Sequence, residues 1–179
     1  MTEQEIIQAA KDSGFSTAEH LDLSTLHFLP EVRSMCSADR CHSYNRNWAC
    51  PPACGTLEEW QEKASHYSKG VLLQTIGDRE DSYDIEAMIE VAHENKDHCD
   101  RMIEKLIGQK ADFTFLAAGA CTRCEKCTWP DAPCRFPEKT YPSMEAAGLF
   151  VSQVCKDNGV PYNYGDEKIA YTCCVLFNE

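Results

Sequence analysis

Apolar residues recur along most of the chain at the spacing of either a helix or a strand, and this pattern predicts an α/β protein. An apolar residue returns every three or four positions in four segments, which predicts helices over residues 2–13, 57–68, 84–108 and 144–157. Short runs of apolar and β-branched residues predict strands over residues 71–76, 113–118 and, more weakly, 26–29.

Local signals mark where these helices begin and end. Thr2 and Glu5 are spaced as a capping box, and Gly14 is placed to end the first helix. Thr56 and Ser143 are typical N-cap residues. The helix after Thr56 directly follows a Cys-Pro-Pro-Ala-Cys segment, so its positive N-terminal end is expected to face that segment.

The order of the elements predicts the sheet. Strand 71–76, helix 84–108 and strand 113–118 form a βαβ unit in this interpretation, and residues 160–164 and 168–177 form a C-terminal hairpin. We therefore expect a mixed sheet in which ligands lie at strand ends and helix starts.

The predicted organisation is one domain. We expect a single α/β iron–sulfur domain over residues 1–179, with residues 1–24 as an N-terminal helical extension and with two cysteine-rich metal-binding loops. A chain of 179 residues is long enough to bury one core.

Composition and charge narrow the class of protein. The chain is 43% hydrophobic and 26% charged, as globular proteins are, and no apolar run approaches the roughly 18 residues of a membrane span. The net charge of −12 argues against a nucleic-acid or anionic-membrane surface, because binding phosphates requires a basic face. The first residues lack the basic and apolar regions of a signal peptide, so we expect a cytoplasmic protein.

The chain contains 12 cysteines, far more than an ordinary domain of this size. Disulfides need an oxidising compartment and mostly stabilise domains too small to build a core. Neither condition applies here, so the cysteines are interpreted as metal ligands rather than as a disulfide framework.

Four cysteines in the second half of the chain have the stronger spacing signal. They follow the pattern C-x2-C-x2-C-x6-C and are Cys121, Cys124, Cys127 and Cys134. Bacterial ferredoxins use the run C-x2-C-x2-C to hold a [4Fe–4S] cluster, whereas zinc sites usually pair cysteines as two separate knuckles. The six-residue gap departs from ferredoxins, so Cys134 is the weakest of the four ligands, and Cys174 is its most plausible substitute. A structural zinc site remains the alternative.

A first group of four cysteines has a less standard pattern. It reads C-x4-C-x8-C-x3-C and comprises Cys36, Cys41, Cys50 and Cys54. Pro51 and Pro52 make the last part rigid and remove two backbone donors. This group is interpreted as a second four-thiolate site, with a [4Fe–4S] cluster favoured over zinc.

Basic residues concentrate around both groups. Segments 31–55 and 119–141 each carry a net charge of +1, so the rest of the chain carries −14. Nearby cations lower the cost of burying an anionic cluster and lower thiol pKa values.

Three stretches resemble a known family. YNRNWACPPACG, CTRCEKC and PCRFPEKTYPSMEAAGLFVSQV resemble a prokaryotic family described only as predicted metal-binding proteins. The resemblance covers roughly residues 25–177 and implies metal binding through these cysteines. It implies no particular reaction.

The remaining candidates are interpreted mainly as structural. Cys99 and Cys155 lie in predicted helices as core thiols, and Cys173 and Cys174 are expected on opposite faces of a strand. His42 and Tyr44 could support the first site, whereas His93 and His98 are expected to be solvated. The chain has no zinc-protease, P-loop, dinucleotide-binding or nucleophile-elbow motif.

The leading functional hypothesis is therefore an iron–sulfur protein for electron transport. It would bind two [4Fe–4S] clusters through the eight grouped cysteines and exchange single electrons with a redox partner protein, whose basic face would dock on the acidic remainder of this chain. One alternative is an enzyme whose first-group cluster has an open iron that binds substrate. Another is a zinc-stabilised interaction module.

Overall fold

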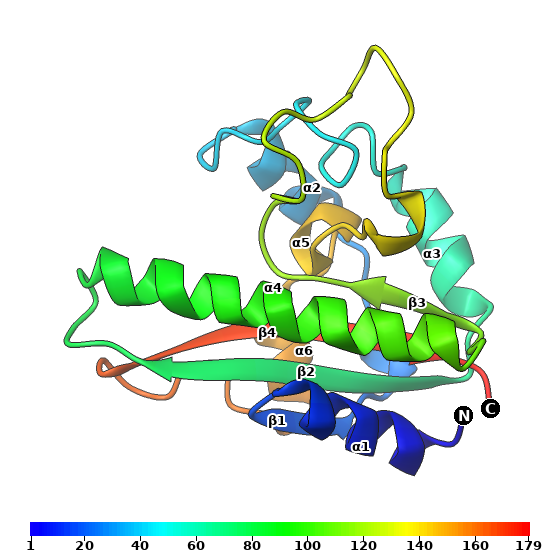
Figure 1. Ribbon diagram of the computed structural model, residues 1–179, viewed down its shortest axis with the longest axis vertical. Helices are drawn as coiled ribbons and strands as arrows, with labels where there is room; N and C mark the ends of the chain where they lie inside the picture. The colour runs from blue at the N-terminus through cyan, green and yellow to red at the C-terminus, as the bar shows by residue number, and fades with distance from the viewer.

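The computed structural model describes residues 1–179, and its centre is an antiparallel sheet of four strands (Figure 1). The strand order is β1-β2-β4-β3. The strands are β1 (Thr17–His20), β2 (Lys69–Asp78), β3 (Phe113–Leu116) and β4 (Lys168–Phe177).

The predicted mixed sheet is wrong, because every pair of neighbouring strands is antiparallel. β2 pairs with β4 over ten residues, from Lys69 opposite Phe177 to Asp78 opposite Lys168. β3 pairs with the other edge of β4, where Leu116 lies opposite Cys174. β2 and β3 therefore point the same way, but β4 lies between them. The helix that joins β2 to β3 spans the sheet without creating a parallel pair.

The predicted C-terminal hairpin does not form. β4 uses both of its edges to pair with β2 and β3, so residues 160–164 remain an irregular segment. Side-chain hydrogen bonds attach this segment to β2 instead. The buried Gln74 donates from Nε2 to the Pro161 carbonyl at 2.9 Å and accepts from the Tyr164 hydroxyl at 2.7 Å.

Helices cover both faces of the sheet. α1 (Glu3–Ser13) and α4 (Ile85–Gly108) bury their apolar residues against one face, and α4 runs along the front of the sheet in Figure 1. α3 (Leu57–Ser65), α5 (Met144–Ala147) and α6 (Val151–Asp157) contribute to a second core on the other face. No helix of the chain is both long and apolar enough to cross a membrane.

The predicted helix boundaries are largely confirmed. Thr2 and Glu5 form the capping box of α1, and Gly14 ends that helix in the left-handed conformation. Thr56 caps α3 in the same way as Thr2 caps α1. The predicted helix over 57–68 ends earlier, at Ser65, and α4 matches the expected helix over 84–108.

The helix expected over 144–157 is broken into α5 and α6 by Gly148. This residue has a φ of 103°, which glycine adopts without strain. A Cβ at this position would collide with Cδ2 of Leu57 on α3. Gly148 therefore ends α5 at a point where the chain passes close to α3.

Two elements were not predicted. β1 forms the edge of the sheet beside β2, and α2 (Pro30–Ser37) precedes the first cysteine-rich loop. The strand expected at 26–29 is reduced to one bridge between Phe28 and Leu149. The two remaining helical segments are short 3-10 turns, η1 (Leu23–Thr25) and η2 (Pro137–Lys139).

The histidines of α4 differ from each other. His93 is exposed, as expected, but His98 is partly buried and packs edge-on against Phe15 with ring centroids 5.6 Å apart. Its Nδ1 also lies 2.8 Å from Oγ1 of Thr75 on β2. The expectation that His98 is solvated is therefore wrong, since this face of α4 packs against α1 and the sheet.

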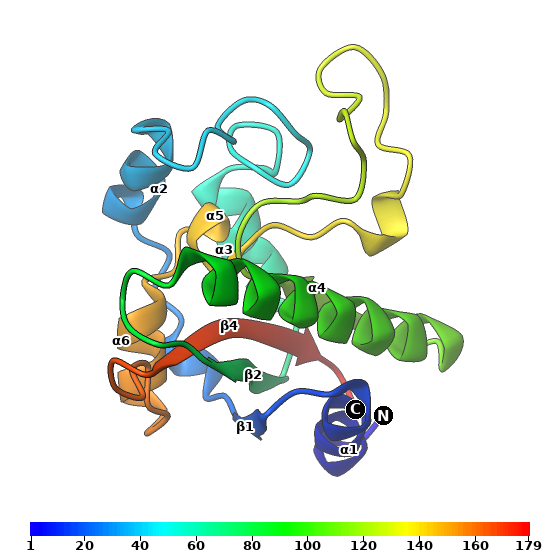
Figure 2. The ribbon, with the colours of Figure 1, turned by 60° about the vertical axis from the view of Figure 1, so that its left-hand side comes forward.

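Both cysteine-rich loops project from the same end of the molecule. The first loop is residues 38–56, between α2 and α3, and the second is residues 117–143, between β3 and α5. They lie side by side above the sheet in both ribbon views (Figures 1 and 2). The fold thus brings together two segments that lie far apart in the sequence.

Candidate metal centres

The four cysteines of the first group lie in one region. Cys36 is in the last turn of α2, and Cys41, Cys50 and Cys54 follow in the first loop. Burial, opposed by a hydrogen bond with Asn47 and reinforced by charge on Cys41, Cys54 and Cys36, raises the pKa of the Cys50 thiol to about 11. All four sulfurs are therefore close enough to interact electrostatically.

Arg33 joins the segments that carry this group. Its Nη1 donates to the Ala146 carbonyl at 2.6 Å, and its Nη2 donates to the Gly55 carbonyl at 2.7 Å. The same Nη1 lies 3.9 Å from the Cys54 sulfur. The Cys54 thiol donates to the Ala146 carbonyl at 3.7 Å. Arg33 therefore links α2, the first loop and α5 beside the thiols.

The charge of Arg33 also affects these thiols. Burial raises the pKa values of Cys36 and Cys54, whereas the Arg33 guanidinium lowers both. A thiolate is the form that binds metal, so a cation at this place favours metal binding.

Three polar residues in the first loop adopt left-handed backbone conformations. Asp39, His42 and Asn45 have φ values of 50°, 54° and 55°, in a left-handed region where these residue types are enriched. The Asp39 carboxylate accepts from the Tyr44 amide at 2.9 Å, and the Asn45 amide donates to the Pro51 carbonyl at 2.7 Å. Neither the His42 ring nor the Tyr44 hydroxyl bonds to a thiol. The first loop is therefore held by its own hydrogen bonds.

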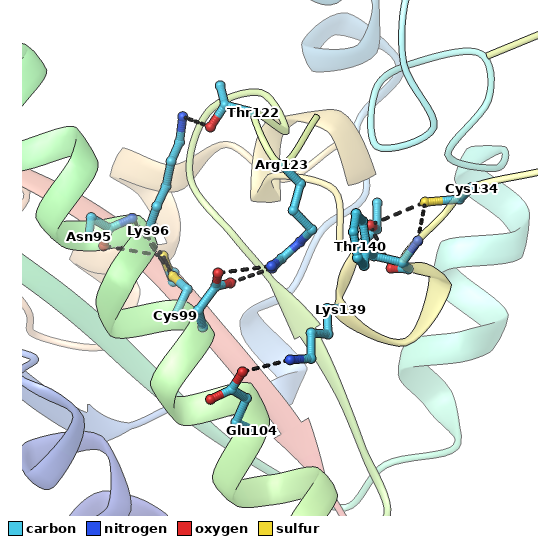
Figure 3. A network of polar contacts seen from close by, with 12 residues as sticks. Asn95, Lys96, Cys99, Glu104, Thr122, Arg123, Cys134, Lys139 and Thr140 are labelled. Carbon is cyan, nitrogen blue, oxygen red and sulfur yellow. Dashed lines mark hydrogen bonds and ion pairs between the residues drawn. The ribbon is translucent and has the colours of Figure 1, made fainter. Parts of the chain in front are cut away.

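The four cysteines of the second group line one small pocket. All four are partly buried. The pocket has a volume of about 20 Å³, enough for about one water molecule. Figure 3 shows the Cys134 sulfur, which accepts from the Phe136 amide at 3.4 Å and lies 3.4 Å from Oγ1 of Thr140. Cys134 thus lines the pocket with the other three cysteines, whereas the fully buried Cys174 lies in the core.

The second loop has many free backbone donors. No backbone N–H from Ala118 to Asp131 donates a hydrogen bond within the chain. This segment contains three of the four cysteines of the second group. Backbone amides commonly donate to cluster sulfurs, and free amides also attract other anions.

Two tryptophans connect the loops. Nε1 of Trp48 donates to Oγ1 of Thr128 at 3.3 Å and to the Ala132 carbonyl at 3.2 Å. Nε1 of Trp129 donates to Oδ1 of Asn45 at 3.0 Å. The two indole rings pack edge to face with centroids 4.7 Å apart. Sequence reasoning missed this contact, although two of the three tryptophans lie within the cysteine groups.

The four remaining cysteines lie in the core. Cys99 and Cys173 face each other on the α4 side of the sheet with sulfurs 3.6 Å apart, and the buried Asn95 amide lies within 3.8 Å of both. Cys155 and Cys174 are buried on the opposite side. The expected opposite orientation of Cys173 and Cys174 is therefore confirmed.

No three His, Cys, Asp or Glu side chains lie close enough together to hold a metal ion as they stand. Metal binding in either group therefore involves rearrangement of the thiols or a ligand larger than one ion. The donor sets themselves fit a soft metal or an iron–sulfur cluster, because both groups consist of thiols alone.

The fold and the two thiol groups define a cysteine-rich metal-binding protein. The chain matches the model of the DUF2284 family, which is described as predicted metal-binding proteins, over residues 19–177. It therefore belongs to that family. No curated protein and no solved structure matches the chain significantly.

Proposed function

We propose that this protein binds two [4Fe–4S] clusters and transfers single electrons to or from a partner protein. Each cysteine group would hold one cluster: Cys36, Cys41, Cys50 and Cys54 the first, and Cys121, Cys124, Cys127 and Cys134 the second. Such clusters supply one-electron chemistry at potentials that the surrounding protein sets.

The second group carries the proposal. Its four thiols line a single pocket, and three of them follow the ferredoxin spacing. The free amides from Arg123 to Asp131 would stabilise negative charge on cluster sulfurs. A zinc site with four thiolates offers fewer hydrogen-bond acceptors for these donors, because it contains no inorganic sulfide.

The first group supports a similar site through its charge. Arg33 contacts Cys54 and lowers the pKa values of Cys36 and Cys54 against the effect of burial. It would offset part of the negative charge of four thiolates and a cluster.

The contact between the loops supports electron exchange within the molecule. Trp48 contacts the second loop through Thr128 and Ala132, and it also lines the pocket of the second cysteine group. Two redox sites in adjacent loops would allow one electron to enter at one site and leave at the other. The acidic remainder of the chain would attract a basic face of the partner.

Reductive titration of anaerobically purified protein, followed by electron paramagnetic resonance, tests this proposal. We expect two one-electron reductions per chain, each producing a paramagnetic iron–sulfur signal. The variants Cys50→Ser and Cys124→Ser should each abolish a different signal. Protein that contains zinc and takes up no electrons would contradict the proposal.

A further inference from the structure

A pocket outside the cysteine groups lies between α4 and the segments 117–123 and 139–141. Its volume is about 350 Å³, which is within the range of small-molecule sites. Lys96, Asp97 and Asp100 on α4 border it on one side. Cys121 lines both this pocket and the pocket of the second cysteine group, so the two are neighbours.

Lys96 differs from the other cations of this pocket in its polar contacts (Figure 3). Its Nζ donates to Oγ1 of Thr122 at 2.9 Å but forms no ion pair with a carboxylate. The other two cations of the pocket are paired: Arg123 bonds to Asp100, and Lys139 lies 2.6 Å from Glu104. Burial lowers the pKa of Lys96, which reflects incomplete hydration of its charge.

Free backbone donors border the same pocket. Residues 118–122 line it, and none of their amides donates a hydrogen bond within the chain. Gly119 has a φ of 70°, and a Cβ at this position would have no atom within 4 Å. A partly buried cation and free amides are the groups with which proteins bind carboxylates and phosphates.

We propose that this pocket binds a small anion carrying a carboxylate or phosphate group, with Lys96 as its main charged contact. Asp97 would repel a second negative charge at the α4 side, and Asp100 is already paired with Arg123. The bound anion would lie beside Cys121, next to the second cysteine group. The inference rests on the pocket and does not require the cysteines to hold iron.

Calorimetric titration of the anaerobically purified protein with inorganic phosphate and with acetate tests the inference, at constant ionic strength and at a mildly acidic pH where both anions carry mainly a single negative charge. We expect saturable binding of at least one of them at one site per chain, and the better ligand indicates the anionic group that the pocket prefers. Lys96→Gln should weaken that binding by about tenfold or more, as the loss of one charged hydrogen bond does.

Lys105→Gln is the matched control, because Lys105 is also a partly buried cation of α4 without a carboxylate partner, and it contacts the Ala9 carbonyl instead. This variant should bind the anion as the unmodified protein does. Iron content should be unchanged in both variants. Absence of saturable binding, equal binding by the Lys96→Gln variant, or loss of iron from that variant would each overturn the inference.

Discussion

Arg33 shows how one residue connects the fold to the first cysteine group. Its two terminal nitrogens donate to carbonyls of α5 and of the first loop, at Ala146 and Gly55, and its charge acts on the thiols. A lysine could keep the charge but has no planar fork with which to reach both carbonyls.

Removing this guanidinium should therefore affect the first site alone. We expect Arg33→Gln to lose about half of the bound iron, the share of one of two clusters, and Arg33→Lys to lose less. Arg46→Gln is the control, because Arg46 is an exposed cation of the first loop and pairs only with Asp39. Iron analysis checks this result, and full iron in Arg33→Gln would contradict it.

His98 predicts a pH dependence of stability. Burial, together with Arg101, lowers the pKa of His98, whereas Glu94 and Asp97 oppose this shift. The unfolded chain then binds the proton more tightly, so stability is full above the ordinary histidine pKa of about 6.5. This contribution to stability is lost as the pH falls below that value and through the lower pKa that His98 has in the folded protein.

Melting temperatures measured between about pH 7.5 and pH 5 test this expectation, since that interval spans the ordinary histidine pKa. His98→Gln should flatten the dependence, because glutamine can still bond to Thr75 and does not titrate in this range. The exposed His93 provides the control variant, His93→Gln. If His98→Gln and the unmodified protein lose the same stability at low pH, His98 is not responsible.

At the residue scale, the sequence was sufficient to predict features whose pattern lies within a few neighbouring residues. The spacing of the cysteines and the cap residues Thr2, Thr56 and Ser143 are short-range patterns, and the structure shows all three residues as N-caps. The Trp48–Trp129 contact and the Lys96 pocket depend on segments far apart in the sequence. Such contacts leave no repeating pattern of residues in the sequence from which they could be predicted.

At the scale of elements, the two cysteine-rich loops differ in what holds them. The first loop makes internal hydrogen bonds, such as that from the Asn45 amide to Pro51. The second loop leaves its amides free from Ala118 to Asp131. The second loop should therefore depend more strongly on its metal for order.

Hydrogen exchange before and after anaerobic removal of iron by a chelator tests this difference. We expect residues 118–131 to lose most of their protection and residues 42–54 to lose less, because only the second loop lacks alternative partners. Equal protection of residues 118–131 with and without iron would contradict the account of this loop.

Gly148 provides a test of the contact between α3 and the α5–α6 break. Gly148→Ala should destabilise the protein by about 2 kcal/mol more than Gly165→Ala, because the new Cβ meets Leu57. Gly165 has a φ of 96°, close to the 103° of Gly148, and open space around it, so its variant carries the backbone strain alone. Thermal unfolding of both variants measures the difference. Equal losses of stability would show that the Leu57 side chain moves aside without destabilising the protein.

Helices α1, α3 and α4 could be predicted because their caps and apolar spacing are local, but α2, the break between α5 and α6, and the sheet could not. The position of β4 between β2 and β3 depends on competition among strands for partners. The apolar run of β4, buried from Thr172 to Phe177, gains most from the central position. Pro161 lacks an N–H, which makes residues 160–164 poor competitors for the same strand.

At the scale of the whole molecule, the sheet and its helices act as a support for two adjacent cysteine-rich loops. Both loops leave the fold at one end (Figure 2), and hydrogen bonds of Trp48 and Trp129 connect them. A redox partner would therefore meet both sites at the same end of the molecule.

The most direct test of the central claim is the iron and acid-labile sulfide content of anaerobically purified protein. The account predicts about eight iron and eight sulfide per chain. Cys50→Ser and Cys124→Ser should each retain about half, and Cys155→Ser, which changes a buried core thiol, should retain all. Stoichiometric zinc without sulfide, or only about four iron in the unmodified protein, would contradict the claim of two [4Fe–4S] clusters.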